Sequence, residues 1–229
     1  MKSLRVLSGG AAQGLVEALC PAFEDKTGCR IEGVFGAVGA MKARLLSGEP
    51  ADVMILSRSL IDELARERHV DGFSASDIGA VQTAIAVRQG DPLPAVGDQD
   101  ELHAALDAAD EIHFPDPEHA TAGIHFAKVM KTLGIAAAGR LRPAPNGNTA
   151  MRALAASTSR RPIGCTQATE ILATPGIALA ANLPPGCDLA TTYTAAATVR
   201  SSAPTEAAAL IRLLTEASSR DARRRLGFL

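Results

Sequence analysis

Short apolar runs alternate with amphipathic stretches along most of the chain. Residues 4–7, 31–35 and 53–56 are apolar and have the length of buried strands, and an amphipathic stretch follows each of them. In these following stretches apolar side chains recur every three or four residues, which is the spacing of one helix face. Alternation of buried strands with amphipathic helices is typical of an α/β fold built on a mainly parallel sheet.

The same pattern continues to the end of the chain. We expect further strands at residues 77–87, 111–114, 162–166 and 191–199, and helices at residues 40–47, 60–68, 99–109, 124–133, 150–156 and 205–216. The tail from Arg220 is basic and then apolar, which favours a short terminal helix docked on the protein. The sequence shows neither an internal repeat nor a low-complexity linker.

Composition argues against several classes of partner. The 229 residues are 47% hydrophobic and 21% charged, enough for a large core and for two domains. The net charge is −2 with both signs interspersed, so no basic stripe is present for nucleic acid or an acidic membrane surface. No apolar run has the length of a membrane span, and the first residues lack the zones of a secretion signal. We expect a cytoplasmic protein, or a periplasmic one if a signal was removed.

The four cysteines do not indicate a metal site. Cys20, Cys29, Cys165 and Cys187 form no CxxC pair and show no zinc-type spacing with histidine, so we expect neither a metal nor a cofactor. Their even number permits a disulfide, most simply between Cys20 and Cys29. Buried free thiols are the interpretation that we favour, because cysteine behaves in this way in reducing compartments.

Small residues occur where predicted strands give way to helices. A turn of small residues before a helix leaves backbone N–H groups unpaired at the positive end of the helix dipole, which is an anion-binding arrangement. The turns lack the phosphate-loop lysine and the GxGxxG spacing, so a small anion is favoured over a nucleotide. Three turns of this kind comprise Ser8, Gly9, Gly10; Ala37, Val38, Gly39; and Thr121, Ala122, Gly123. The simpler interpretation is that their glycines only permit tight turns.

Polar residues at two other predicted strand ends and helix starts complete this set. Ser57 and Arg58 directly follow the strand at residues 53–56, where a guanidinium can reach an anion. Asn148 or Thr149 is a natural cap for the helix predicted at residues 150–156. Because ligands of open α/β sheets gather at the carboxyl ends of parallel strands, we expect turns on neighbouring strands to face one crevice.

The chain resembles the molybdate-binding class of periplasmic solute-binding proteins. The likeness covers nearly the whole chain in order. It is carried by residues 4–10, 36–39, 46–53 with the GEPADV run, 116–123, 162–164 and 193–199. It implies a type II periplasmic-binding-protein fold: two α/β lobes, residues 1–79 with 191–229 and residues 80–190, which hold the ligand in the cleft and close by hinge motion. The implied ligand contacts are Ser8, Val38, Ala122, residues 148–150 and Gln167.

Two positions depart from that class. Val38 stands where a serine hydroxyl usually meets a tetrahedral oxyanion, and Gln167 stands where a tyrosine commonly closes the site. The segment at residues 163–177 is instead similar to the corresponding segment of bacterial aconitate isomerases. That likeness implies a small tricarboxylate ligand, and isomerisation by removal and return of a proton beside a double bond.

Isomerisation needs a proton carrier, and three residues are candidates. His125 lies just inside a helix start, His119 lies in a loop, and Glu170 follows the strand at residues 162–166. Each also has an ordinary interpretation: a surface or core histidine, a solvated loop histidine, and an acid beside a helix dipole.

Three functions therefore remain open. The first is a solute-binding protein for a small anion, a di- or tricarboxylate rather than molybdate, which delivers its ligand to an ABC transporter permease if it is exported. The second is an aconitate-isomerase-like enzyme in the cytoplasm. The third is a cytoplasmic anion sensor. The fold cannot separate them, because function belongs to the site and not to the scaffold.

Overall fold

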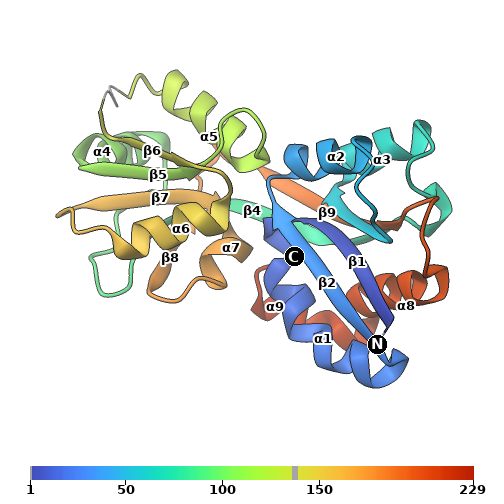
Figure 1. Cartoon of the computed structure of the whole chain (residues 1–229). Helices are drawn as coiled ribbons and strands as arrows, with labels where there is room; N and C mark the ends of the chain where they lie inside the picture. Colours follow the sequence, from blue (N-terminus) through green and yellow to red (C-terminus); the bar gives the residue numbers. More distant parts are fainter. Residues whose placement is uncertain (1, 136–138) are drawn as a thin grey trace. The chain divides into compact units, whose positions relative to one another are not determined.

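A computed structural model describes residues 2–135 and 139–229 (Figure 1). The chain divides into two compact units. Unit 1 comprises residues 1–81 and 191–229, and unit 2 comprises residues 82–190. In the described residues, no helix is both long enough and apolar enough to cross a membrane.

Unit 1 is an α/β unit on a mixed sheet. Its elements are β1 (Lys2–Gly9), α1 (Gln13–Thr27), β2 (Cys29–Gly36), α2 (Val38–Leu46), β3 (Val53–Ser57), α3 (Arg58–Arg66), the first part of β4 (Ser76–Arg88), β9 (Ala190–Ala197), α8 (Pro204–Thr215) and α9 (Arg220–Arg225). The strand order is β2-β1-β3-β9-β4. β1 pairs in parallel with β2 and β3, whereas β9 runs antiparallel to β3.

Strand register brings the carboxyl ends of the parallel strands of unit 1 to one edge. Gly9 is level with Gly36 of β2, and Ser8 is level with Ile55 of β3. The four side chains before Ser57 in β3 are fully buried, as expected for a strand covered on both faces. The turns that leave these strands therefore lie side by side.

Unit 2 repeats this plan with different connections. Its elements are the remainder of β4, α4 (Gln99–Ala108), β5 (Glu111–Pro115), α5 (Thr121–Thr132), β6 (Leu141–Ala144), α6 (Gly147–Ala156), β7 (Pro162–Gln167), α7 (Ala168–Leu172) and β8 (Ile177–Asn182). The strand order is β4-β7-β5-β6, with β8 paired to β4. β5 is parallel to β6 and β7, so the starts of α5, α6 and α7 follow strand ends at one edge (Figure 1).

The structure confirms the predicted α/β class and adds two strands. The predicted strands and helices are present with shifted ends, and the tail contains the short helix α9. The strands β6 and β8 were not predicted. β6 is mostly exposed and contains Pro143, and β8 is only partly buried, so neither carries the apolar run that marks an interior strand.

Two helix starts differ from the prediction. α5 begins at Thr121 instead of residue 124, so Thr121, Ala122 and Gly123 form its first turn and not a loop. α6 begins at Gly147 instead of residue 150. In both cases the first turn is too poor in apolar side chains for hydrophobic periodicity to reveal it.

The cysteines are all free, as the sequence favoured. Cys29, Cys165 and Cys187 are buried and Cys20 is half-buried. Cys165 belongs to the apolar core of unit 2, where Phe114 and Phe126 pack edge to face with ring centroids 5.8 Å apart.

Candidate functional site

The first two turns of unit 1 are in contact. A Cβ atom added to Gly9 would lie 2.8 Å from Cγ1 of Val38 and 3.1 Å from the ring of Tyr193. Only glycine therefore fits between the turn after β1, the start of α2 and the middle of β9. Tyr193 is almost fully buried and lies level with Ser57 of β3. The structure thus brings together Ser8 to Gly10, Ala37 to Gly39 and Ser57, as the strand-end argument predicted.

Two helix starts at this edge have no side-chain cap in the described part of the chain. α2 follows Ala37 and α3 follows Ser57, and neither preceding residue accepts a hydrogen bond from the first turn through its side chain. The first N–H groups of both helices are consequently available to an acceptor. Such groups, with the helix dipole behind them, attract an anion.

The serine hydroxyl groups at this edge already have hydrogen-bond partners within the protein. Ser8 is fully buried, and its Oγ donates to the carbonyl oxygen of Gly9 at 2.9 Å. Oγ of Ser57 lies 3.3 Å from Oγ of Ser59. Backbone N–H groups therefore contribute more to an anion site here than hydroxyl groups do.

Arg58 has an acidic partner in unit 1. Its guanidinium forms an ion pair with Asp77, and Asp77 also accepts a hydrogen bond of 2.6 Å from Thr194. Burial raises the pKa of Asp77, but the hydrogen bonds from Arg58 and Thr194 outweigh burial and hold that pKa below its ordinary value. Asp77 is therefore ionised at neutral pH and holds Arg58, so Arg58 must exchange this partner to bind an anion directly.

The start of α5 is shaped by glycine. A Cβ atom on Gly123 would lie 2.2 Å from the carbonyl oxygen of Asp116 and 2.3 Å from that of Pro115. The helix can thus pack its first turn directly on the end of β5. Ala120 precedes α5 and provides no side-chain cap among the described residues, which leaves the N–H groups near Thr121 and Ala122 for a ligand.

The start of α6 is capped by a residue that the sequence analysis did not select. Oδ1 of Asn146 accepts a hydrogen bond of 2.9 Å from the backbone N–H of Thr149. The prediction that Asn148 or Thr149 is the cap is therefore wrong. An AsnGlyAsn run offers two possible asparagine caps, and the position of the first turn decides between them. Gly147 and Asn148 lie within the first turn and are buried.

Glu170 is a buried carboxyl group next to this helix start. It is 5% exposed, and its Oε2 accepts a hydrogen bond of 2.5 Å from Oγ1 of Thr166. A Cβ atom on Gly147 would lie 1.9 Å from the same Oε2, so the carboxyl group packs on the backbone of Gly147. Burial raises the pKa of Glu170 to about 7, although hydrogen bonds from Thr166 and from the backbone of Gln167 act in the opposite direction.

Two buried hydroxyl groups lie near the end of β7. Thr83 of β4 is level with Gln167, and Oγ1 of Thr83 and of Thr169 has no hydrogen-bond partner within the described residues. Gln167 itself is 2% exposed and precedes α7. Because buried hydroxyl groups nearly always have partners, this edge of unit 2 has unused capacity for a polar ligand.

The two candidate histidines have structural partners. Nε2 of His125 lies 2.7 Å from the carbonyl oxygen of Cys187, and this contact requires the nitrogen to donate. His119 is exposed and its Nδ1 lies 3.2 Å from Oδ2 of Asp116. Glu170 is the buried one of the three proton-carrier candidates. Its own pKa is raised towards neutrality.

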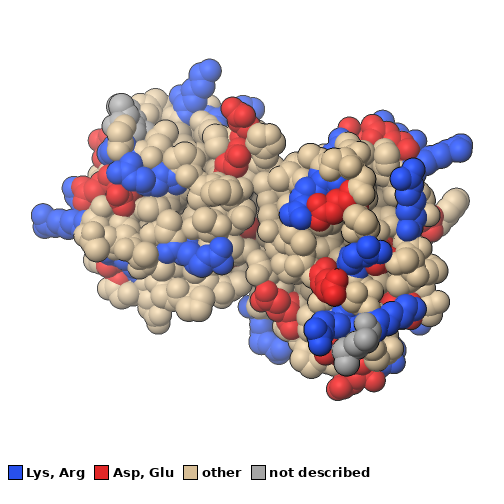
Figure 2. Space-filling view, in the orientation of Figure 1, with Lys and Arg blue, Asp and Glu red and all other residues tan. Residues whose placement is uncertain are grey.

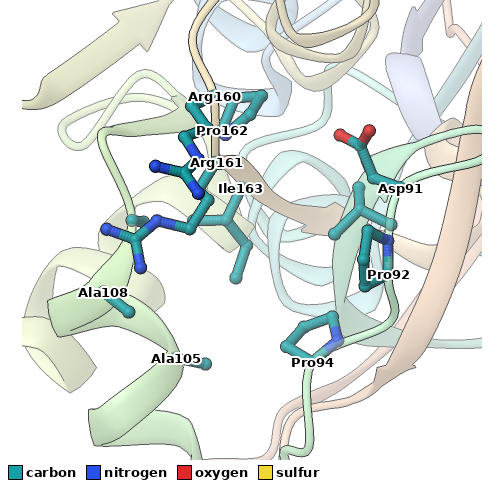
Figure 3. Close-up of a pocket in the computed structure, with 11 residues that line it drawn as sticks. Asp91, Pro92, Pro94, Ala105, Ala108, Arg160, Arg161, Pro162 and Ile163 are labelled. Carbon is teal, nitrogen blue, oxygen red and sulfur yellow. The ribbon is translucent and has the colours of Figure 1, made fainter.

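A separate pocket of about 200 Å³ lies at the opposite edge of the sheet in unit 2. Ala105, Ala108, Pro162 and Ile163 give it an apolar wall near the starts of β5 and β7. Figure 3 shows Arg160 and Arg161 on one side of it and Asp91 on the other. Because Asp91 is paired with Arg88 at 2.8 Å and Arg161 lies 3.8 Å from Asp110, most of these charges are already balanced.

The face shown in Figure 2 has no patch of a single charge among the described residues. On the face shown in Figure 2, lysine and arginine are interspersed with aspartate and glutamate over both units. This arrangement agrees with the small net charge of the sequence.

Sequence reasoning missed three residues of these edges. They are Tyr193, Thr83 and Thr166, all at least 97% buried. Tyr193 is the one tyrosine of the chain and stands on a predicted strand, a signal that was available in the sequence. The two threonines had no such signal, because their importance comes from the residues they meet on other elements.

Comparisons with known proteins agree with this architecture. A family model described as bacterial extracellular solute-binding protein matches residues 4–229. An aconitate isomerase from Pseudomonas sp. is 30% identical over 228 residues, which cover 96% of this chain and 84% of that protein. Both findings confirm the resemblance seen in the sequence.

Solved structures show the fold. The periplasmic molybdate-binding protein of Azotobacter vinelandii matches with a TM-score of 0.82 at 16% identity, covering 99% of this chain and 98% of that chain. The sulfate-binding protein SubI from Mycobacterium tuberculosis H37Rv matches with a TM-score of 0.79 at 16% identity, covering 100% of this chain and 86% of that chain. At these identities the likeness establishes the type II periplasmic-binding-protein fold and leaves the ligand open.

Proposed function

Because the chain belongs to the family of bacterial extracellular solute-binding proteins, we propose that it binds a small di- or tricarboxylate. The observation that carries this proposal is the set of uncapped helix starts at one edge of each sheet, in α2, α3 and α5. Backbone N–H groups at helix starts bind anions without a bound metal or a free lysine. The two uncapped starts within unit 1, of α2 and α3, suit a ligand with more than one anionic group.

Two features favour a carboxylate over a tetrahedral oxyanion. Val38 can donate only its backbone N–H, and the hydroxyl of Ser8 is already bonded to Gly9, so the hydroxyl donors expected for molybdate are reduced. The relative at 30% identity is by name an enzyme of aconitate, which is a tricarboxylate. For the binding function, the proposed partner is the permease of an ABC transporter, which an exported receptor would meet at the outer face of the inner membrane.

Isomerisation is the second candidate function, and Glu170 favours it. A carboxyl group with a pKa of about 7 can both take and return a proton at neutral pH. In a 1,3-proton shift, a base removes a proton from the methylene carbon of the substrate, the double bond moves, and a proton returns to the former vinylic carbon. No electron is gained or lost overall, so this chemistry needs one acid/base group and a clamp for the carboxylates.

A panel of ligands tests the binding function. Melting temperatures are measured with molybdate, tungstate, sulfate, citrate, cis-aconitate and trans-aconitate, since a ligand that binds the native state raises the melting temperature. We expect stabilisation by the tricarboxylates and not by the tetrahedral oxyanions. Stabilisation by molybdate or tungstate alone would contradict the carboxylate assignment.

Proton NMR then separates the two functions. The protein is incubated with cis-aconitate, and the vinylic signals of both isomers are followed over time. Appearance of trans-aconitate above the rate in buffer shows isomerisation. Binding in the thermal assay without any conversion shows a receptor.

A further inference from the structure

The carboxyl group of Glu170 is packed on the first residue of α6. Gly147 has no side chain, and the space that a Cβ atom would need is filled by Oε2 of Glu170 and by Oγ1 of Thr166, at 1.9 and 2.2 Å from that position. The carboxyl group therefore lies at the positive end of α6, a helix of ten residues. The family resemblance also implies ligand contacts at residues 148–150, in the first turns of this helix.

No opposite charge is placed to neutralise this carboxyl group within the described residues. The carboxyl group accepts hydrogen bonds from the hydroxyl group of Thr166 and from the backbone of Gln167. No cation contributes to its pKa. On α6 the one charged side chain is Arg152, which is exposed and bonds Thr149 at 3.3 Å.

Within the part of the chain that the structure describes, the other elements around Glu170 also provide no charged partner for its carboxyl group. The one titratable side chain of β7 is the buried thiol of Cys165, and burial raises the pKa of this thiol well above its ordinary value. β8 and the rest of α7 have no titratable side chain. On β5, Glu111 and His113 interact with each other, and Glu111 accepts a hydrogen bond from Ser157 just beyond the far end of α6. The charge state of Glu170 is thus set by burial, by its two hydrogen bonds and by any anion bound at the start of α6.

Two negative charges at one helix start compete for the same positive potential. An ionised Glu170 cancels the field that α6 offers, since a helix end is equivalent to about half an elementary charge. A protonated Glu170 leaves that field to an anion. Since coupling between two binding events is reciprocal, an anion that favours protonated Glu170 must also raise the proton affinity of Glu170.

We infer that Glu170 is a proton-binding site coupled to the anion site at the start of α6, so that the carboxylate ligand binds together with one proton. The inference rests on the proposed function, because it concerns the carboxylate ligand proposed there. The raised pKa of Glu170, about 7, places this exchange at neutral pH. In an isomerase the same proton would be available beside the substrate, and in a receptor it would make uptake depend on pH.

Calorimetry with tricarballylate tests the inference. Tricarballylate is a saturated tricarboxylate that cannot isomerise and is almost fully ionised above pH 7. Titrations at pH 7, 8 and 8.5 in buffers of different ionisation enthalpy give both the affinity and the number of protons taken up. We expect proton uptake approaching one at pH 8.5, and affinity about tenfold weaker at pH 8.5 than at pH 7.

A matched pair of variants identifies the group. In E170Q we expect proton uptake to disappear and the affinity to become independent of pH. E111Q carries the same substitution near the other end of α6, at a carboxyl that is ionised throughout this range, and should behave as the unmodified protein does. Loss of the pH dependence in E111Q but not in E170Q would overturn the assignment.

A direct titration covers the case in which E170Q does not fold. The side-chain carboxyl resonance of Glu170 in the unmodified protein is followed by carbon NMR with and without tricarballylate, and its pKa should rise by at least about two units on binding. Binding with no proton uptake and no such rise overturns this inference and leaves the proposed function standing. Failure of every tricarboxylate to bind overturns both.

Discussion

Two glutamates of unit 2 lie near opposite ends of α6 and hold their protons very differently. Oε2 of Glu111 accepts a hydrogen bond of 2.6 Å from Ser157, the residue that follows α6, and Oε1 accepts one of 3.2 Å from Arg142. These partners, led by Ser157, lower the pKa of Glu111 to about 2. Burial instead raises the pKa of Glu170 to about 7.

The charge of each glutamate is therefore set by its hydrogen-bond partners and its exposure to solvent, and not by residue type. Glu111 is partly exposed and has a cation and several donors, so its ionised form is the stable one. Glu170 has donors but no cation among the described residues and almost no solvent, so its neutral form persists to neutral pH. The first arrangement suits a structural link between strands, and the second suits a group that exchanges a proton.

The most disruptive test of this comparison is the substitution Gly147→Ala. The added Cβ atom would overlap Oε2 of Glu170, and the backbone or the carboxyl group would have to move. We expect a loss of unfolding free energy of about 3 kcal/mol, measured by urea denaturation, since overpacking of a tight core costs this much at its upper range.

Gly72→Ala is the control for that experiment. The Cβ atom added there meets only the Cβ of Ala65, at 3.4 Å, which is an ordinary contact. We expect its stability to change by no more than about 0.5 kcal/mol. Equal stabilities of the two variants would show that Glu170 does not pack on Gly147 as described.

A second test follows the pH dependence of stability at Glu170. Because its pKa rises from an ordinary 4.5 to about 7 on folding, the folded protein binds this proton more tightly than the unfolded chain does. Its contribution to stability is complete below pH 4.5 and is lost as the pH rises to 7, with a total of about 3 kcal/mol. The stability difference between the unmodified protein and E170Q, measured by urea denaturation from pH 4 to 8, should fall by this amount. A constant difference would mean that the pKa of Glu170 is ordinary.

The smallest expected effect belongs to Glu111→Gln, and its sign is the reverse. The pKa of Glu111 is depressed on folding, so its contribution to stability is present above pH 4.5 and is lost as the pH falls towards 2. At pH 7 we expect E111Q to be less stable by about 1 kcal/mol, because its hydrogen bonds to Ser157 and Arg142 lose a charged acceptor. Thermal unfolding at pH 7 and pH 2.5 measures this, and a loss that grows at low pH would contradict it.

Local sequence was sufficient to predict most of the fold and the positions of the turns at the strand ends of unit 1. Apolar runs and the three- to four-residue spacing predicted the interior strands and most helices, and small residues at strand ends predicted the turns at Gly9 and Gly36 to Gly39. These features depend on near neighbours, so a pattern can show them. The contacts assigned to individual residues at those turns stay predictions.

The structure decided the features that depend on residues far apart along the chain. The ion pair of Arg58 with Asp77, the choice of Asn146 as the cap of α6, and the exposed strand β6 have no mark in a local pattern. The burial of Glu170 against Gly147 is of the same kind, because 22 intervening residues must fold before the two meet.

The chain by itself determined an α/β protein of the solute-binding type, with small-residue turns leading into helices. Tertiary structure alone decided which polar groups at those turns are already engaged and which carboxyl group is kept neutral. The physical reason is that helix and strand periodicity is written in consecutive side chains, whereas desolvation and ion pairing are properties of a site assembled from several elements.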